Sequence, residues 1–95
     1  MSRNGDRTKM RERRSKDRII LEILSICIEG ENITKIVYTA NTNFTTIRAY
    51  LDLLIRNGMM ITIDGSPVLY KTTEKGLSII DRLQMLQEEL AAIRQ

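Results

Sequence analysis

The sequence predicts a mostly helical α+β fold, and three consecutive segments lead to that prediction. Residues 33–58 have the pattern of two short amphipathic helices joined by a turn rich in Asn and Thr. Residues 59–73 form a β-hairpin pattern around the turn Asp-Gly-Ser-Pro. A helix then begins near Thr73 and Glu74 and continues without a proline to about Arg94. This order is that of a winged helix-turn-helix with a long C-terminal coiled-coil helix.

The length of 95 residues predicts one domain with a small core. Hydrophobic residues are 42% of the chain but aromatic residues only 4%, so Ile, Leu, Met and Val must build that core. We expect a disordered basic arm over residues 1–15, a winged helix-turn-helix domain over residues 16–73 and a dimerisation helix over residues 74–95. A partner chain would add the burial that a domain of this size lacks.

Positive charge is concentrated at the N-terminus. Residues 1–16 contain seven basic and two acidic residues, which is 7 minus 2, or +5, so the chain from Asp17 onward carries 3 minus 5, or −2. A basic arm of this kind can neutralise DNA phosphates and release their counterions. The alternative is a disordered tail that only improves solubility. Our candidate phosphate contacts in the arm are Arg11, Arg13 and Arg14.

The first helix is expected to start at a cap formed by Ser15 or Asp17 and to end near Glu29, before Gly30. Helical spacing predicts one buried face, made by Ile20, Ile23, Leu24 and Cys27. Three more isoleucines lie outside that stripe, Ile19, Ile26 and Ile28, so either a second surface covers this helix or a small core wraps around it. The single cysteine is interpreted as a small buried hydrophobe in a reducing interior.

The second helix is expected over residues 34–40. Thr34 and Lys35 lie at its start, where a hydroxyl, free N–H groups and a Lys can hold a DNA phosphate. The alternative is an ordinary capping residue followed by a solvated charge.

The third helix is the candidate reading helix, with Asn43 as its N-cap. Its predicted inner face consists of Ile47, Tyr50, Leu51, Leu54 and Ile55, and its outer face of Thr45, Thr46, Arg48, Ala49, Asp52 and Arg56. The first four outer residues occupy the turns that approach base edges in a major groove. Arg48 can bind a guanine bidentately, and the Thr and Ala side chains can meet other base edges or a thymine methyl group. Any solvent-exposed helix could also carry such a face.

The predicted wing consists of strands over residues 59–63 and 68–73. Its turn has no basic residue, so we expect only backbone contact with DNA, with Lys71 or Tyr70 near a phosphate. Packing against the body is the simpler interpretation of Tyr70.

The last helix carries apolar residues spaced 4, 3, 4 and 3, namely Ile79, Leu83, Leu86, Leu90 and Ile93. This heptad seam predicts self-association, and packing back onto the chain's own domain is the alternative. An antiparallel pair with Leu83 opposite Leu86 places Gly76 opposite Ile93 and Arg82 beside Glu89. A parallel pair places Glu89 beside Arg94, so charge leaves the orientation open.

Catalysis and membrane insertion are not expected. The chain has no His and a single Cys, so neither a His-based acid or base nor a zinc site can form, and no phosphate-binding Gly-rich loop is present. No apolar run approaches the roughly 18 residues that span a bilayer. We therefore expect a soluble, cytoplasmic, nucleoid-associated protein with no enzyme activity, cofactor, metal or evident small-molecule ligand.

The chain resembles the small archaeal winged-helix DNA-binding proteins that dimerise through a C-terminal antiparallel coiled coil and are described as chromatin-associated proteins or transcriptional regulators. The resemblance covers about residues 16–94. It rests on the segment EGENITKIVYTANTNFTTIRAYLDLLIRNGM, the hairpin, the sequence TEKG and the heptad tail. It implies DNA binding by the helix that begins near Asn43 and dimerisation by the helix that begins near Glu74.

Two functional hypotheses follow. In the first, a homodimer binds double-stranded DNA as a transcriptional regulator or chromatin-associated protein. In the second, the winged helix is a protein-protein interaction module without direct DNA readout. The second is favoured by the weakly basic third helix, where Asp52 lies between Arg48 and Arg56.

Overall fold

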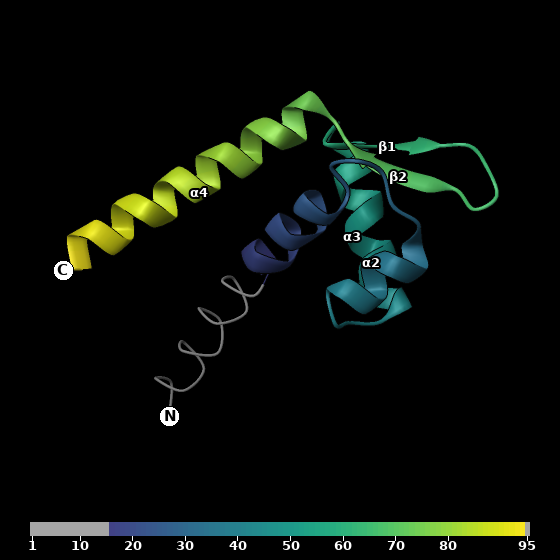
Figure 1. The fold of residues 1–95 in the computed structure, drawn as a ribbon, viewed down its shortest axis with the longest axis horizontal. Coiled ribbons are helices and arrows are strands. Elements are labelled where there is room, and N and C mark those ends of the chain that lie inside the picture. The colour runs from purple at the N-terminus through teal and green to yellow at the C-terminus, as the bar shows by residue number, and fades with distance from the viewer. Residues whose placement is uncertain (1–15, 95) are drawn as a thin grey trace.

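The computed structural model describes residues 16–94 and confirms the predicted fold class (Figure 1). A helix over residues 16–26 is followed by α2 (Ile33–Thr39) and α3 (Phe44–Arg56). The antiparallel strands β1 (Met60–Ile63) and β2 (Leu69–Thr72) form the wing, and α4 (Glu74–Arg94) projects from the body. Ser15 and the arm residues Arg11, Arg13 and Arg14 lie outside the described part of the chain.

The three N-terminal helices enclose one core of aliphatic side chains. Each helix turns a stripe inward, and β1 and α4 close the core, whose buried members are Ile23, Leu24, Cys27, Ile36, Val37, Ile47, Leu51, Leu54, Met60 and Ile80. Burying aliphatic side chains of this size is worth about 1.5 to 3 kcal/mol each. Ile19, Ile20 and Ile26 pack at the edge of the core, whereas Ile28 is partly exposed. Core residues therefore pack against more than one side of the first helix, as expected if a small core wraps around it.

The first helix ends three residues earlier than expected. Residues 27–29 form a turn and Gly30 adopts a φ of 95°, which favours glycine. The Cys27 carbonyl accepts hydrogen bonds from the N–H groups of Gly30 (3.1 Å) and Thr72 (3.0 Å). The turn and β2 therefore supply the hydrogen-bond donors for this carbonyl, which lies at the end of the helix where no intrahelical donor is available.

The start of α2 also differs from the expectation. Asn32 is the N-cap, and its side chain accepts a hydrogen bond from the Lys35 N–H at 2.9 Å. The interpretation of Thr34 as the cap was wrong. Glu31 exchanges backbone hydrogen bonds of 2.9 and 2.8 Å with Tyr70, and this pairing sets where α2 begins.

The base of the wing is fastened to the first helix by Thr72. This buried residue donates its hydroxyl to the Leu24 carbonyl at 2.7 Å. In addition, the Thr73 hydroxyl donates to the Gly58 carbonyl at 2.6 Å and accepts from the Gly76 N–H at 3.2 Å. The wing and the first turn of α4 are therefore held to the body by the same short segment.

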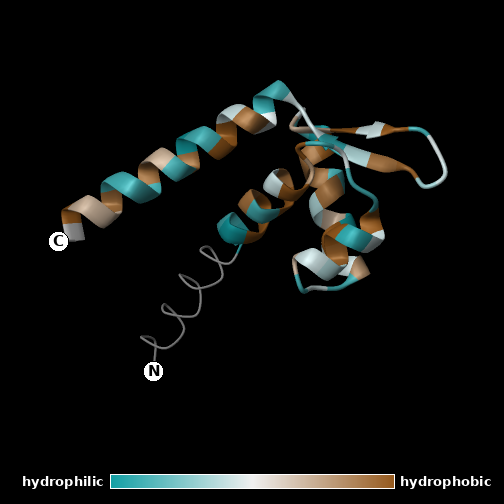
Figure 2. Ribbon diagram, in the orientation of Figure 1, coloured by the Kyte–Doolittle hydropathy of each residue, from teal (hydrophilic) through white to brown (hydrophobic). Residues whose placement is uncertain are grey.

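The proximal and distal halves of α4 have different surroundings. Gly76 and Ile80 are buried, and Ile79 and Leu83 are half-buried against the body. Farther along, Leu86 and Leu90 are about half exposed, and Ile93 is 79% exposed. Figure 2 shows these hydrophobic positions continuing along α4 beyond the body. The alternative in which the helix packs on its own domain therefore describes the proximal half only.

Among residues 16–94, none of the helices combines the length and apolarity that crossing a membrane requires.

Gly76→Ala should destabilise the fold. A Cβ atom at this position would lie 2.5 Å from Thr72 Cγ2 and 2.6 Å from the Met59 carbonyl oxygen, so backbone would have to move. We expect urea unfolding to show a decrease in stability of about 1 to 3 kcal/mol. Ser78→Ala, at an exposed position of the same helix, is the control and should change the free energy of unfolding little. Equal stability of both variants would contradict the close packing at Gly76.

Candidate nucleic-acid interface

The turn between α2 and α3 is held by backbone hydrogen bonds. The Thr42 N–H donates to the Val37 carbonyl at 3.1 Å, and the Asn41 N–H donates to the Tyr38 carbonyl at 3.2 Å. Asn41 has a φ of 54°, a left-handed conformation that Asn adopts more readily than most residues. The turn therefore sets a defined orientation between the two helices.

Asn43 caps α3, as predicted. Its backbone is extended, and its side chain accepts a hydrogen bond from the Thr46 N–H at 2.9 Å. The other early N–H groups of a helix have no intrahelical acceptor. The start of α3 can therefore offer backbone donors to an acceptor such as a phosphate oxygen.

The outer face of α3 is accessible over most of the predicted positions. Thr45, Arg48, Ala49 and Arg56 are exposed, while Thr46 is half-buried beside the cap. The opposite face is locked into the core by the buried residues Ile47, Leu51 and Leu54, with Tyr50 and Ile55 partly buried at its edges. The predicted division of this helix into an inner and an outer face is confirmed.

The charge on this face is small. Asp52 is also exposed and lies between the two arginines in sequence, as expected. Thr34 and Lys35 are exposed on α2, but Lys35 Nζ lies 4.0 Å from the carboxylate of Glu31. Lys71 is exposed on β2, whereas Tyr70 packs against the core, which supports the simpler interpretation of Tyr70. Few basic side chains therefore lie on or near the outer face of α3.

Two exposed aromatic residues at the turn were not among the predicted contacts. Tyr38 in α2 is 81% exposed, and Phe44, the first residue of α3, is 48% exposed. The chain has only four aromatic residues, and Tyr50 and Tyr70 pack against the core. The position of Tyr38 outside the apolar stripe of α2 was a signal available in the sequence, whereas Phe44 has the spacing of the inner face of α3 and only the structure shows that it is exposed.

The wing presents apolar rather than basic side chains. Ile61, Ile63 and Val68 are exposed, and Lys71 is paired in register with Ile61. The residues of its turn, from Asp64 to Pro67, include no cation. This surface has little attraction for phosphate.

Cys27 is buried and inert. Burial, and to a smaller extent the negative charge of Glu31, raises the pKa of the Cys27 thiol to about 12. The thiolate is the reactive form of cysteine, so this side chain acts as a core residue at neutral pH.

Comparison with known proteins identifies the family. A family model for the winged helix-turn-helix matches residues 13–91. The chain belongs to the winged helix-turn-helix family. This winged helix-turn-helix protein is 37% identical over 89 residues to the uncharacterized protein MJ0287 of Methanocaldococcus jannaschii, a match that covers 93% of this chain and 88% of the relative.

Solved structures share the fold. Sso10a-2, a DNA-binding protein from Sulfolobus solfataricus, has a TM-score of 0.62 and 25% identity, over 80% of this chain and 85% of that one. The repressor MarR of Listeria monocytogenes has a TM-score of 0.65 at 12% identity, over 99% and 82% of the two chains. Sco5413, a MarR family regulator from Streptomyces coelicolor, has a TM-score of 0.65 at 18% identity, over 96% and 80%. The resemblance to small archaeal winged-helix proteins is confirmed by the two archaeal relatives.

Asn43→Ala should loosen the start of α3. The change removes the acceptor of the Thr46 N–H, and removing such a cap costs about 1 kcal/mol. Urea unfolding should show this decrease, and Asn43→Ser, which retains an acceptor oxygen, should remain close to the original protein. If alanine and serine were equally stable, the side chain of Asn43 would not support the helix start.

Proposed function

We propose that this protein binds double-stranded DNA as a homodimer and acts as a transcriptional regulator or a chromatin-associated protein. One observation carries the proposal, the uncovered outer face of α3 on a helix whose opposite face is locked into the core. The major groove of B-DNA admits an α-helix, and the first turns of such a helix reach base edges. The relative Sso10a-2 is described as a DNA-binding protein, which supports the same partner.

Each exposed polar group has a role in this proposal. Arg48 contacts a guanine, and Thr45 and Ala49 meet neighbouring base edges or a thymine methyl group. The half-buried Thr46 contributes at the capped start of the helix. The remaining contacts go to phosphates and fix the register of the protein on DNA. The residues that make them are Thr34, Lys35, Asn43, Arg56 and Lys71.

The N-terminal arm supplies much of the electrostatic attraction. The chain from Asp17 onward carries a charge of −2, so the described body gains little affinity from its net charge. Residues 1–16 carry +5 and include Arg11, Arg13 and Arg14. Each phosphate that they neutralise releases counterions and raises affinity at low salt. This role places the protein at the nucleoid.

The homodimer forms through α4. Its distal apolar residues, Leu86, Leu90 and Ile93, are exposed and continue the stripe that begins with Ile79 and Leu83. Apolar positions repeated in this way bury one another when two helices pair. A dimer would also present two copies of α3 to DNA.

A protein-protein interaction module is the second candidate. It is favoured by the carboxylate of Asp52 on the outer face of α3 and by the exposed aromatic residues Tyr38 and Phe44. A gel-shift titration against random duplex DNA at two salt concentrations distinguishes the candidates. Absence of a salt-sensitive shift at micromolar protein would favour the interaction module.

Arg48→Ala and Arg56→Ala should weaken DNA binding in different ways. Removing a bidentate guanine contact costs about 1 to 3 kcal/mol and relaxes preference at one base pair. We therefore expect Arg48→Ala to broaden the sequences recovered in a DNA-selection experiment. Arg56→Ala removes the same charge from the last turn of α3 and should lower the affinity for all DNA sequences equally. Identical selection profiles for the two variants would contradict base reading by Arg48.

Deleting residues 1–14 should lower both the affinity and its salt dependence. The deletion removes six basic and two acidic residues, a net charge of 6 minus 2, or +4. The slope of log K against log salt should become shallower by about 0.9 for each phosphate that the arm no longer neutralises. Fluorescence anisotropy with one duplex across a salt series measures this slope. An unchanged slope would show that the arm does not contact phosphates.

A further inference from the structure

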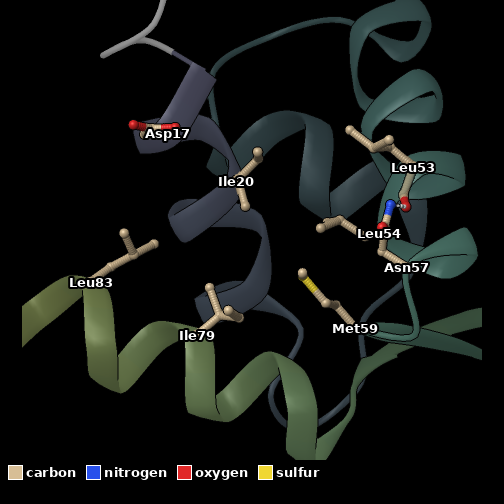
Figure 3. Close-up of a pocket in the computed structure, with 8 residues that line it drawn as sticks. All are labelled: Asp17, Ile20, Leu53, Leu54, Asn57, Met59, Ile79 and Leu83. Atoms are coloured by element: carbon tan, nitrogen blue, oxygen red, sulfur yellow. Dashed lines mark hydrogen bonds between the residues drawn. The ribbon is translucent and has the colours of Figure 1, made fainter.

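Two large apolar side chains of α3 are exposed, and they lie toward opposite ends of the helix. Phe44, its first residue, is 48% exposed, and Leu53, near its other end, is 41% exposed. Leu53 lines an apolar pocket of about 350 Å³ where α4 leaves the body, and Figure 3 shows it there with Ile79 and Leu83 of α4. The exposure of Leu53 therefore belongs to the surroundings of α4. That of Phe44 belongs to the end of α3 that approaches DNA in the proposed function.

The fold does not use Phe44 as a core residue. Its side chain belongs neither to the buried core nor to the partly buried side chains packed against that core. The start of α3 is held instead by Asn43, whose side chain accepts a hydrogen bond from the Thr46 N–H at 2.9 Å. A half-exposed aromatic ring leaves apolar surface in water, which is unfavourable in proportion to the exposed area. A partner that covers the ring would remove this unfavourable exposure.

The groups that surround Phe44 on the helix are suited to DNA. Residues four positions apart lie on the same side of a helix, with Cβ atoms about 5 to 6 Å apart, so Phe44 adjoins Arg48 and Thr45 adjoins Ala49. All four side chains are exposed. The first backbone N–H groups of α3 lie at the same end. One apolar ring, one guanidinium group and several N–H donors therefore share this surface.

Base edges in the major groove offer only one apolar group. Guanine, cytosine and adenine present hydrogen-bond donors and acceptors there, whereas thymine adds its 5-methyl group. A phenyl ring has no hydrogen-bonding group, so thymine is the one base edge that it favours, and Phe is among the side chains that make this contact.

We propose that Phe44 determines specificity by contacting the 5-methyl group of a thymine close to the guanine bound by Arg48, an inference that rests on the proposed DNA binding. The Cβ separation of about 5 to 6 Å between these residues lies between one and two steps of about 3.4 Å along a DNA strand. The thymine is therefore one or two base pairs from the guanine. The preferred half-site contains an A·T pair and a G·C pair at this spacing.

Charge favours DNA over a protein as the partner that covers the ring. The first turn of α3 has no acidic residue. Asp52, the first exposed carboxylate along the helix, is eight positions from Phe44, which is about 12 Å at 1.5 Å per residue. The surface around the ring thus combines cationic and N–H groups without a carboxylate from α3, which complements the negative charge of DNA.

The first test is a double-mutant cycle between protein and DNA. A duplex recovered by the original protein in a DNA-selection experiment is resynthesised with deoxyuridine in place of each thymidine in turn, which removes one methyl group and keeps the base pair. Covering one methyl group raises affinity about fourfold. Fluorescence anisotropy should therefore show a loss of about fourfold at one thymine in each half-site for the original protein. For Phe44→Ala the same replacement should have no effect.

Two further variants control this cycle. Tyr38→Ala removes the other exposed aromatic ring at the turn, which is 81% exposed, and should retain the fourfold effect. Phe44→Leu keeps an apolar side chain and should retain part of the effect. Circular dichroism verifies that each variant is folded, and Phe44→Ala should unfold in urea close to the original protein because Phe44 lies outside the core.

The second test requires no variant. 5-Bromodeoxyuridine replaces the thymidine identified in the first test, so that bromine occupies the place of the methyl group. Irradiation then links the base to the side chain that contacts it, and fragmentation in mass spectrometry locates the link. A link at Phe44 is expected. A link at Thr45, Ala49 or any other residue instead would overturn the inference.

The outcomes separate this inference from the proposed function. Absence of salt-sensitive DNA binding would overturn both. DNA binding in which every deoxyuridine replacement affects the original protein and Phe44→Ala alike would overturn the thymine contact alone. A methyl effect that Phe44→Ala abolishes and Tyr38→Ala retains, together with a link at Phe44, is the expected result.

Discussion

The fold depends on how Thr72 joins the wing to the first helix. Its hydroxyl donates to the Leu24 carbonyl and its N–H donates to the Cys27 carbonyl. Both carbonyls lie at the end of that helix, where C=O groups have no intrahelical donor. Buried polar groups are costly unless they are paired, so this connection holds the hairpin against the body. The close contact of Gly76 with Thr72 then brings α4 onto the same point. Wing, first helix and last helix therefore share one junction.

This junction leaves α3 free to present one face to a partner. The first helix, α2 and α3 bury their aliphatic stripes against one another, and the wing closes the core from one side. The outer face of α3 remains exposed to solvent, because none of the elements within residues 16–94 covers it. In the proposed function, the weak charge of this face leaves recognition to shape and a few contacts, and the proposal assigns long-range attraction to the basic residues before Asp17.

The C-terminal helix combines two structural tasks on a single apolar stripe. Its proximal side chains complete the domain, with Ile80 in the core and Ile79 and Leu83 at the pocket. Its distal side chains extend into solvent with the same heptad spacing. Heptad spacing shows that a helix has an apolar side, but it contains no information about which residues the helix's own domain covers.

Local patterns in the sequence determined the fold class, the order of the elements, the cap at Asn43 and the inner face of α3. These features depend on spacing and on residue type within a few positions, so they can be read along the chain. Tertiary contacts decided the rest. Pairing of Glu31 with Tyr70 fixed the chain just before α2, Thr72 joined β2 to the end of the first helix, and packing against the body buried only the proximal half of α4. Each of these depends on residues far apart in sequence, whose proximity exists only once the chain has folded.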